Sequence, residues 1–185
     1  MPKKASQLLL DHLDLLLDAK LSLPVLDLAC GTGRNGLVLA HHGIPVVFAD
    51  KSITALEAVK RHLSGNALPG QIWQVDLEQT GSNPLADREF SAIIGFNYLH
   101  RPIFSALKDS VKPGGLVIYE TFTVENRRFG RPSNPKFLLR HGELKSIFQN
   151  WEIIFYFEGI QPEPARGIAQ IVARRPMSPW SQYRT

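Results

Sequence analysis

One stretch near the N-terminus, from Val25 to Gly36, constrains the fold of this sequence most strongly. It begins with an apolar run that holds a single acidic residue, Asp27, and continues through two glycines, Gly31 and Gly33. An amphipathic, helix-like run follows from Gly36. A strand, a tight glycine turn and a helix start in this order are typical of open α/β sheets. Such sheets bring backbone close to a nucleotide-like ligand at the carboxyl end of a strand.

The composition indicates one folded domain. The chain has 185 residues, of which 44% are hydrophobic and 21% are charged, a balance typical of globular proteins. We expect a single domain over residues 1–175 and a frayed tail over residues 176–185, which lack hydrophobic periodicity. No apolar run approaches the roughly 20 residues that span a bilayer. Acidic residues interrupt the N-terminal leucines, which argues against a signal peptide. The single cysteine excludes an internal disulfide. These features predict a cytoplasmic protein without membrane contact.

The charge is unevenly distributed along the chain. The first 100 residues hold eight Lys and Arg against ten Asp and Glu, and the remainder hold thirteen against seven. The basic residues of the second half could simply lie on the solvated surface. Alternatively, they could produce a positive field near the substrate entrance that favours an anionic small molecule or RNA. No block of basic residues interleaved with aromatic ones is present, so the sequence argues against a nucleic-acid partner.

The order of apolar and amphipathic segments predicts an α/β fold: a doubly wound, mostly parallel seven-stranded sheet with an antiparallel last strand and helices on both faces. Residues 158–166 are too few for a crossover helix, so the last two strands should be antiparallel. The strands are expected at Pro24–Ala29, Ile44–Ala49, Gly70–Val75, Phe90–Asn97, Leu116–Phe122, Trp151–Phe157 and Gly167–Arg174, and the helices at Ser6–Leu17, Arg34–His42, Ser52–Leu63, Pro102–Val111 and Gly142–Gln149.

Three acidic residues, Asp27, Asp50 and Asp76, fall at the ends of three successive predicted strands. The glycine turn also matches the dinucleotide pattern G-x-G-x-x-G, but a carboxylate beside it would repel a pyrophosphate. A cationic nucleoside fits better, since S-adenosylmethionine carries an ammonium, a sulfonium and a ribose and has no phosphate. Asp50 would then accept the ribose hydroxyls, and Asp76 would meet the adenine amino group.

These segments resemble the motifs of the Rossmann-like, class I S-adenosylmethionine-dependent methyltransferases. The resemblance covers roughly residues 24–122, and it rests on Val25–Gly33, on the strand Val46–Asp50, on Asp76, on the strand Phe90–Asn97 and on the turn Lys112–Gly115. Within that superfamily the glycine turn looks most like small tellurite-resistance-type enzymes. Ala29 departs from the pattern, since glycine is common at its position.

The resemblance implies S-adenosylmethionine as the cofactor and assigns a set of residues to its binding. The last two members of the set end the fourth predicted strand, toward which the methyl group should point. The predicted cofactor-binding residues are Asp27, Ala29, Gly31, Gly33, Arg34, Asn35, Asp50, Lys51, Ser52, Asp76, Leu77, Phe96 and Asn97.

Three residues beyond the cofactor motifs are candidates for catalysis. His100 could act as a general base, or it could be a surface or helix-capping residue. Tyr98 could line the pocket, or pack under the following helix. Glu120 could orient a substrate amine or hydroxyl, or pair with an arginine such as Arg127.

The segment from Thr123 to Arg140 is long, polar and rich in arginine, so it is a candidate lid that could bind an anionic substrate. Cys30 is interpreted as a packed residue, and the histidines lack metal-ligand spacing, so no metal is predicted.

We therefore expect methyl transfer from S-adenosylmethionine to a small molecule. An RNA methyltransferase, a non-catalytic S-adenosylmethionine-binding module and an NAD-linked oxidoreductase remain alternatives. The acceptor and the oligomeric state are left open.

Overall fold

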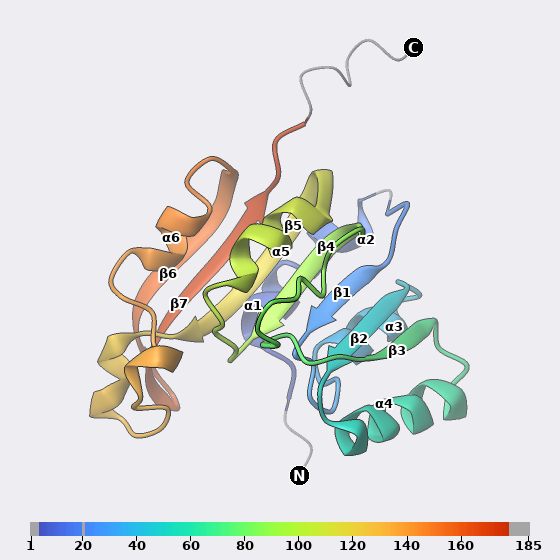
Figure 1. Cartoon of the computed structure of the whole chain (residues 1–185), viewed down its shortest axis with the longest axis horizontal. Helices are drawn as coiled ribbons and strands as arrows, with labels where there is room; N and C mark the ends of the chain where they lie inside the picture. Colours follow the sequence, from blue (N-terminus) through green and yellow to red (C-terminus); the bar gives the residue numbers. More distant parts are fainter. Residues whose placement is uncertain (1–3, 20, 178–185) are drawn as a thin grey trace.

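A computed structural model describes residues 4–19 and 21–177 of the chain (Figure 1). One seven-stranded sheet runs through it in the order β3-β2-β1-β4-β5-β7-β6. The neighbours from β3 to β5 pair in parallel, and β7 is antiparallel to both β5 and β6. The strands are β1 (Val25–Leu28), β2 (Val46–Asp50), β3 (Gly70–Gln74), β4 (Phe90–Phe96), β5 (Val111–Phe122), β6 (Glu152–Pro162) and β7 (Ala165–Arg174). The predicted sheet, including its antiparallel last strand, is confirmed.

Helices cover both faces of this sheet. One buried cluster packs α5 and α6 against one face, and a second packs α1 to α4 against the other. The helices are α1 (Gln7–Asp11), α2 (Leu13–Leu17), α3 (Gly36–His41), α4 (Ile53–Gly65), α5 (Ile103–Ser110) and α6 (Glu143–Ile147). Strands β1 and β4 are buried along their whole length, as expected for parallel strands covered on both sides.

The predicted first helix, Ser6–Leu17, is wrong in one respect, because it is broken at His12 into α1 and α2. Leu8, Leu9 and Leu16 are all buried. Both short helices nevertheless contribute leucines to the same buried cluster.

Two predicted connections near the C-terminal strands also differ. The expected turn at residues 112–115 is a bulge inside β5, since Phe90 pairs with Val111 and Ala92 next pairs with Leu116. The expected loop at residues 158–166 is a tight hairpin in which Pro162 pairs with Ala165. Neither place has the apolar alternation typical of a strand. Both are extended because their backbone pairs with a neighbouring strand.

The segment from residue 123 to residue 140 is more ordered than a predicted irregular loop. It holds two 3-10 helices, η1 (Val124–Arg128) and η2 (Pro135–Phe137). Leu138 and Leu139 are fully buried, and Thr123 forms an isolated bridge with Leu139. The segment is therefore anchored at both of its ends.

Across the described ranges, no helix combines the length and the apolar character needed to cross a membrane. The fold does not test the cytoplasmic location, which stays a prediction. The predicted frayed tail falls mostly on residues 178–185, which lie outside the described residues.

Gly36 provides a test of how closely β1 and α3 approach each other. A Cβ at Gly36 would lie 2.6 Å from Asp27 Oδ2 and 2.6 Å from the Phe48 ring. We expect Gly36→Ala to lower the free energy of unfolding by about 1–3 kcal/mol, because the packed neighbours must move. Urea denaturation measures this change.

The matched control is Gly65→Ala at the end of α4, where a Cβ would meet no atom within 4 Å. This variant should be neutral or slightly stabilising, because alanine restricts the unfolded chain. Equal effects of the two substitutions would contradict the packing argument.

Candidate functional site

The candidate site lies at the carboxyl ends of β1 and β4. The strand order changes direction between these neighbours, since the chain runs outward from β1 to β3 on one side and from β4 to β5 on the other. In open α/β sheets ligands bind in the crevice at such a point. The connections that follow β1, β2, β3 and β4 all reach this edge.

The glycine turn after β1 presents its backbone to this edge. Ala29, Gly31 and Gly33 have left-handed φ angles of 53°, 55° and 77°. A Cβ at Gly31 would meet no atom within 4 Å, whereas one at Gly33 would lie 2.9 Å from Val59. The first glycine therefore borders open space that a ligand can occupy, and the second packs inward. Alanine rarely adopts this φ, and such strain is often found at functional sites.

Asp50, at the end of β2, holds the glycine turn in place. Its Oδ2 accepts a hydrogen bond from the Gly31 amide at 2.7 Å, and its Oδ1 accepts one from the Ser52 amide at 2.8 Å. Ser52 in turn caps α4, because its hydroxyl accepts from the Ala55 amide at 3.2 Å. The side chain of Lys51 is exposed beside them. Each oxygen of the carboxylate retains acceptor capacity for a ligand.

A cavity of about 150 Å³ opens directly beside Asp50. Asp76 and Glu78 are exposed, and Leu77 between them is buried. The cavity is lined by Ala29, Asp50, Lys51, Val75, Asp76, Leu77, Glu78 and Tyr98. Five of the predicted cofactor-binding residues, from three different strand ends, thus meet at one cavity.

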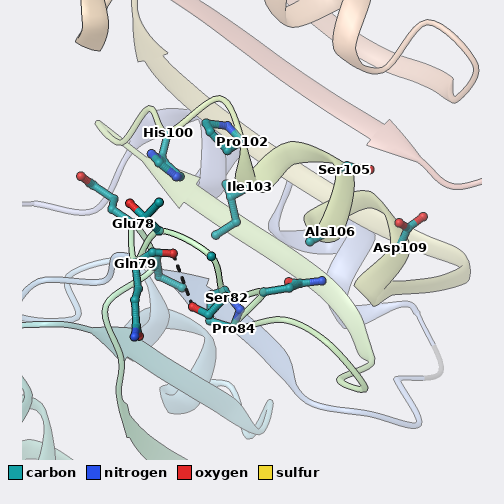
Figure 2. A pocket seen from close by; sticks show the side chains of 14 residues that line it. Glu78, Gln79, Ser82, Pro84, His100, Pro102, Ile103, Ser105, Ala106 and Asp109 are labelled. Carbon is teal, nitrogen blue, oxygen red and sulfur yellow. Dashed lines mark hydrogen bonds between the residues drawn. The ribbon is translucent and has the colours of Figure 1, made fainter.

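A second cavity, of about 400 Å³, adjoins the first and shares Leu77 and Glu78 with it. It lies between α5 and the connection from β3 to β4. Figure 2 shows His100 and Glu78 at one end of this cavity and Asp109 at the other.

Asp27 does not line either cavity. Its side chain is 2% exposed, and its Oδ2 accepts a hydrogen bond from the Gly36 amide at 2.9 Å. Burial raises the pKa of the Asp27 carboxyl from 3.8 to about 7, although the Gly36 hydrogen bond opposes this shift. Asp27 ties β1 to the first turn of α3 through this hydrogen bond, and its predicted contact with a ligand ammonium stays a prediction.

Arg34 and Asn35 bind the N-terminal segment of the chain. Arg34 donates a hydrogen bond to the Lys4 carbonyl at 2.8 Å, and the buried Asn35 accepts one from the Ser6 amide at 2.8 Å. These two predicted cofactor-binding residues therefore hold residues 4–6 beside the glycine turn. Neither residue lines the two cavities described above.

Phe96 and Asn97, at the end of β4, differ in their surroundings. Phe96 is buried in the core on the side of α1. Asn97 is exposed, has a φ of 58°, and donates its amide to the Glu120 carbonyl at 2.8 Å. Asparagine tolerates this left-handed backbone, and the turn directs the chain from β4 toward the first cavity.

The three catalytic candidates occupy separate surroundings. Tyr98 lines the first cavity and His100 the second, whereas Glu120 is 1% exposed on the face of the sheet covered by α1. Within the described ranges, no hydrogen bond or ion pair joins any two of them. They therefore do not form one catalytic group.

Glu120 is the centre of a buried polar cluster. Its Oε2 accepts hydrogen bonds from Ser6 Oγ at 3.3 Å and from Gln170 Nε2 at 2.6 Å. Its Oε1 lies 3.2 Å from an Arg166 guanidinium nitrogen. The suggested partner Arg127 is wrong, because that side chain donates to the Ser133 carbonyl. Arg166 replaces it because β7 pairs with β5, a contact between distant parts of the sequence.

Arg101 fixes the segment that the sequence indicated as a lid. It forms two hydrogen bonds with the Glu143 carboxylate, at 2.6 and 2.9 Å, and it also donates to the carbonyls of Lys136 and Leu138. Partial burial raises the pKa of the Glu143 carboxyl, but the hydrogen bonds from Arg101 and from the Arg140 amide, together with the charges of both arginines, outweigh it and lower the pKa. A two-point ion pair of this kind holds the end of the segment in one geometry.

Sequence reasoning missed two residues that shape the site. Glu78 lines both cavities, and its position two residues after Asp76 was a signal that could have found it. Tyr119 donates its hydroxyl to the Tyr98 carbonyl at 2.8 Å, a contact that no local pattern indicates.

Cys30 is partly buried, and burial raises the pKa of its thiol. The thiol is therefore a poor nucleophile. Within residues 4–19 and 21–177, no group of three or more His, Cys, Asp and Glu side chains could hold a metal ion.

Comparisons with known proteins find similarity to methyltransferases. Residues 25–115 match the family model described as a methyltransferase domain. An uncharacterised methyltransferase of Bacillus subtilis, YodH, is 31% identical over 102 residues, which cover 51% of this chain and 41% of that protein. The chain thus spans less than half the length of this curated relative.

Solved structures share the fold. TehB from Haemophilus influenzae superposes with a TM-score of 0.73 at 22% identity, over 89% of this chain and 61% of that one. Magnesium protoporphyrin IX methyltransferase from Synechocystis, solved with S-adenosylhomocysteine bound, has a TM-score of 0.67 at 15% identity, over 91% and 81% of the two chains.

The buried carboxyl of Asp27 predicts a pH-dependent stability. The folded protein holds this proton between about pH 4 and about pH 7, where the unfolded chain has lost it. The free energy of unfolding should therefore fall as the pH rises through this range, by up to about 1.4 kcal/mol per pH unit. Asp27→Asn should lose this slope, because its amide does not titrate. Urea denaturation at pH 5, 6 and 7 measures it.

The control for this prediction is Asp109→Asn, which removes an exposed carboxylate on α5. This variant should keep the slope of the unchanged protein. An Asp27→Asn variant with the same slope would show that Asp27 is ionised in the folded state.

Proposed function

Because the chain carries a methyltransferase domain of the class I, S-adenosylmethionine-dependent superfamily, we propose that it transfers a methyl group from S-adenosylmethionine to a small-molecule acceptor. The observation that carries the proposal is the position of Asp50. Its carboxylate holds the Gly31 amide and borders the cavity between the ends of β2 and β3.

The residues at this edge fit the cofactor. Gly31 borders open space, so backbone can approach the ligand. Asp50 would accept hydrogen bonds from the ribose hydroxyls, and Asp76 would accept one from the adenine amino group. Leu77 would pack against the adenine ring. S-adenosylmethionine has no phosphate, so the site needs no phosphate-binding group. The three carboxylates at the first cavity would repel a phosphate.

S-adenosylmethionine, when bound, supplies a methyl group already activated by its sulfonium. The chain itself then has to bind the two reactants, align them and exclude water. Residues 4–6, held by Arg34 and Asn35 beside the glycine turn, are suited to exclude water from that end of the site.

His100 is proposed as the general base where the acceptor must lose a proton, because it is partly exposed at a cavity. Glu120 is proposed as a positioning residue. Its contacts with Ser6 and Gln170 connect the N-terminal segment to the end of β5, so it acts on the site through those residues.

A small acceptor is supported by the relatives. The Synechocystis protein is named as acting on magnesium protoporphyrin IX. An anionic acceptor would depend on Arg127, Arg131 and Arg140, which form no ion pair with a carboxylate of the described residues. Arg128, by contrast, is paired with Glu125. No observation on this chain favours RNA over a small molecule.

Calorimetry with S-adenosylhomocysteine tests the proposal. The unchanged protein should bind it, and Asp50→Ala should weaken binding by roughly ten- to a hundredfold, because hydrogen bonds to a charged acceptor are lost. Glu57→Ala, which removes an exposed carboxylate on α4 that lines neither cavity, is the control and should bind normally. Absence of binding by the unchanged protein would refute the assignment.

The acceptor is sought with a metabolite extract and labelled S-adenosylmethionine. Mass spectrometry should find a small molecule that gains one CH₂ unit. Binding of the cofactor without turnover across such an extract would favour a non-catalytic module instead.

A further inference from the structure

Tyr98 lines the proposed cofactor site and carries a buried hydroxyl group that has no hydrogen-bond partner among the described residues. The ring lines the cavity that Asp50, Asp76 and Glu78 also line. A buried hydroxyl without a partner is costly, so its presence at this cavity calls for a function.

The backbone around Tyr98 is held firmly. Asn97, with its left-handed φ, turns the chain at the end of β4. The Tyr98 carbonyl then accepts a hydrogen bond from the fully buried Tyr119 hydroxyl at 2.8 Å. Tyr119 has room for its ring only because Gly95 lacks a Cβ, which would collide with that ring. Gly95, Asn97 and Tyr119 thus fix the backbone position from which Tyr98 lines the cavity.

The charges around the cavity determine which hydrogen-bonding groups a ligand must bring. Asp50, Asp76 and Glu78 carry carboxylates, which accept hydrogen bonds and donate none when ionised. Burial, followed by the fields of Glu78, Asp76 and Asp50, raises the pKa of the Tyr98 phenol. The phenol therefore keeps its proton at neutral pH and remains a donor. Lys51, another side-chain donor at this cavity, is exposed to solvent.

Adenosine carries both kinds of hydrogen-bonding group. Its ribose hydroxyls and exocyclic amine are donors, and the carboxylates match them. Its purine ring nitrogens are acceptors, which carboxylates cannot satisfy. Only a protein donor enclosed with the base can pair with such a nitrogen out of water.

We propose that the Tyr98 hydroxyl donates a hydrogen bond to a ring nitrogen of the adenine of S-adenosylmethionine, and that Tyr98 is a cofactor-binding residue. The inference rests on the proposed function, because it assigns a residue within the same site. Tyr98 then favours a base that places a hydrogen-bond acceptor opposite its hydroxyl. Its role is in binding the cofactor and not in the methyl-transfer step.

The test compares binding with stability in Tyr98→Phe. The unliganded variant should be at least as stable to thermal unfolding as the unchanged protein, because it removes only a hydroxyl without a protein partner. Its affinity for S-adenosylhomocysteine, measured by calorimetry, should fall roughly tenfold, as expected for one hydrogen bond of about 1.4 kcal/mol. A tyrosine with a purely structural role would not combine these two results.

Tyr156→Phe is the matched control. This tyrosine lies on β6 outside the cavity and donates its hydroxyl to Glu158. Its replacement removes a phenolic hydroxyl of the same kind and should leave the affinity for S-adenosylhomocysteine unchanged.

Analogues of S-adenosylhomocysteine that lack one ring nitrogen identify the acceptor atom. The 1-deaza, 3-deaza and 7-deaza compounds are titrated into the unchanged protein and into Tyr98→Phe. One analogue should bind the unchanged protein roughly tenfold more weakly and lose no further affinity in the variant, since both changes remove the same hydrogen bond.

The outcomes separate the two proposals. If the unchanged protein does not bind S-adenosylhomocysteine, the proposed function fails and this inference fails with it. If the unchanged protein binds and Tyr98→Phe binds within twofold of it, the inference alone is overturned. Losses that add fully for all three analogues would also overturn it, because Tyr98 would then pair with no ring nitrogen.

Discussion

The hydrogen bond between the buried Asp27 carboxyl and the Gly36 amide is the interaction on which the site depends. It brings the start of α3 directly against β1, where the missing Cβ of Gly36 leaves room for the carboxyl group and the Phe48 ring. The residues between strand and helix must then turn through left-handed backbone at Ala29 and at the two glycines that follow. The Gly31 amide in this turn then donates a hydrogen bond to Asp50, which lines the first cavity.

Strand β5 organises both sides of the site. Neighbouring residues on a strand point to opposite faces of a sheet, so Tyr119 and Glu120 serve different layers. Tyr119 packs with α5 and positions the backbone of Tyr98 at the first cavity. Glu120 faces α1 and holds Ser6 and Gln170. One strand therefore links the proposed adenosine side of the site to the N-terminal segment.

The sheet and much of the cofactor edge were predictable because their signals are local. Continuous apolar runs ending in acidic residues mark buried parallel strands, and the acids at the ends of β2 and β3 do meet at one cavity. The bulge in β5 and the short hairpin between β6 and β7 were missed. Pairing with a neighbouring strand decides these features, and the run of residues 158–166 alone is typical of a loop. The Arg166 partner of Glu120 was missed for the same reason, since the two residues are 46 positions apart in the sequence.

By itself the sequence determined the α/β class, the glycine turn and the acidic residues at successive strand ends, because each follows from residue type and short-range spacing. Only the tertiary structure decided what each of those residues does. Asp27 and Asp50 have the same side chain near the ends of neighbouring strands, yet Asp27 lies in register with Phe48, two residues before Asp50, and is enclosed by α3, whereas Asp50 borders a cavity. Tyr98, His100 and Glu120 are separated for the same physical reason. Burial and orientation depend on which helix covers each face of the sheet, and that is set by contacts between distant parts of the chain.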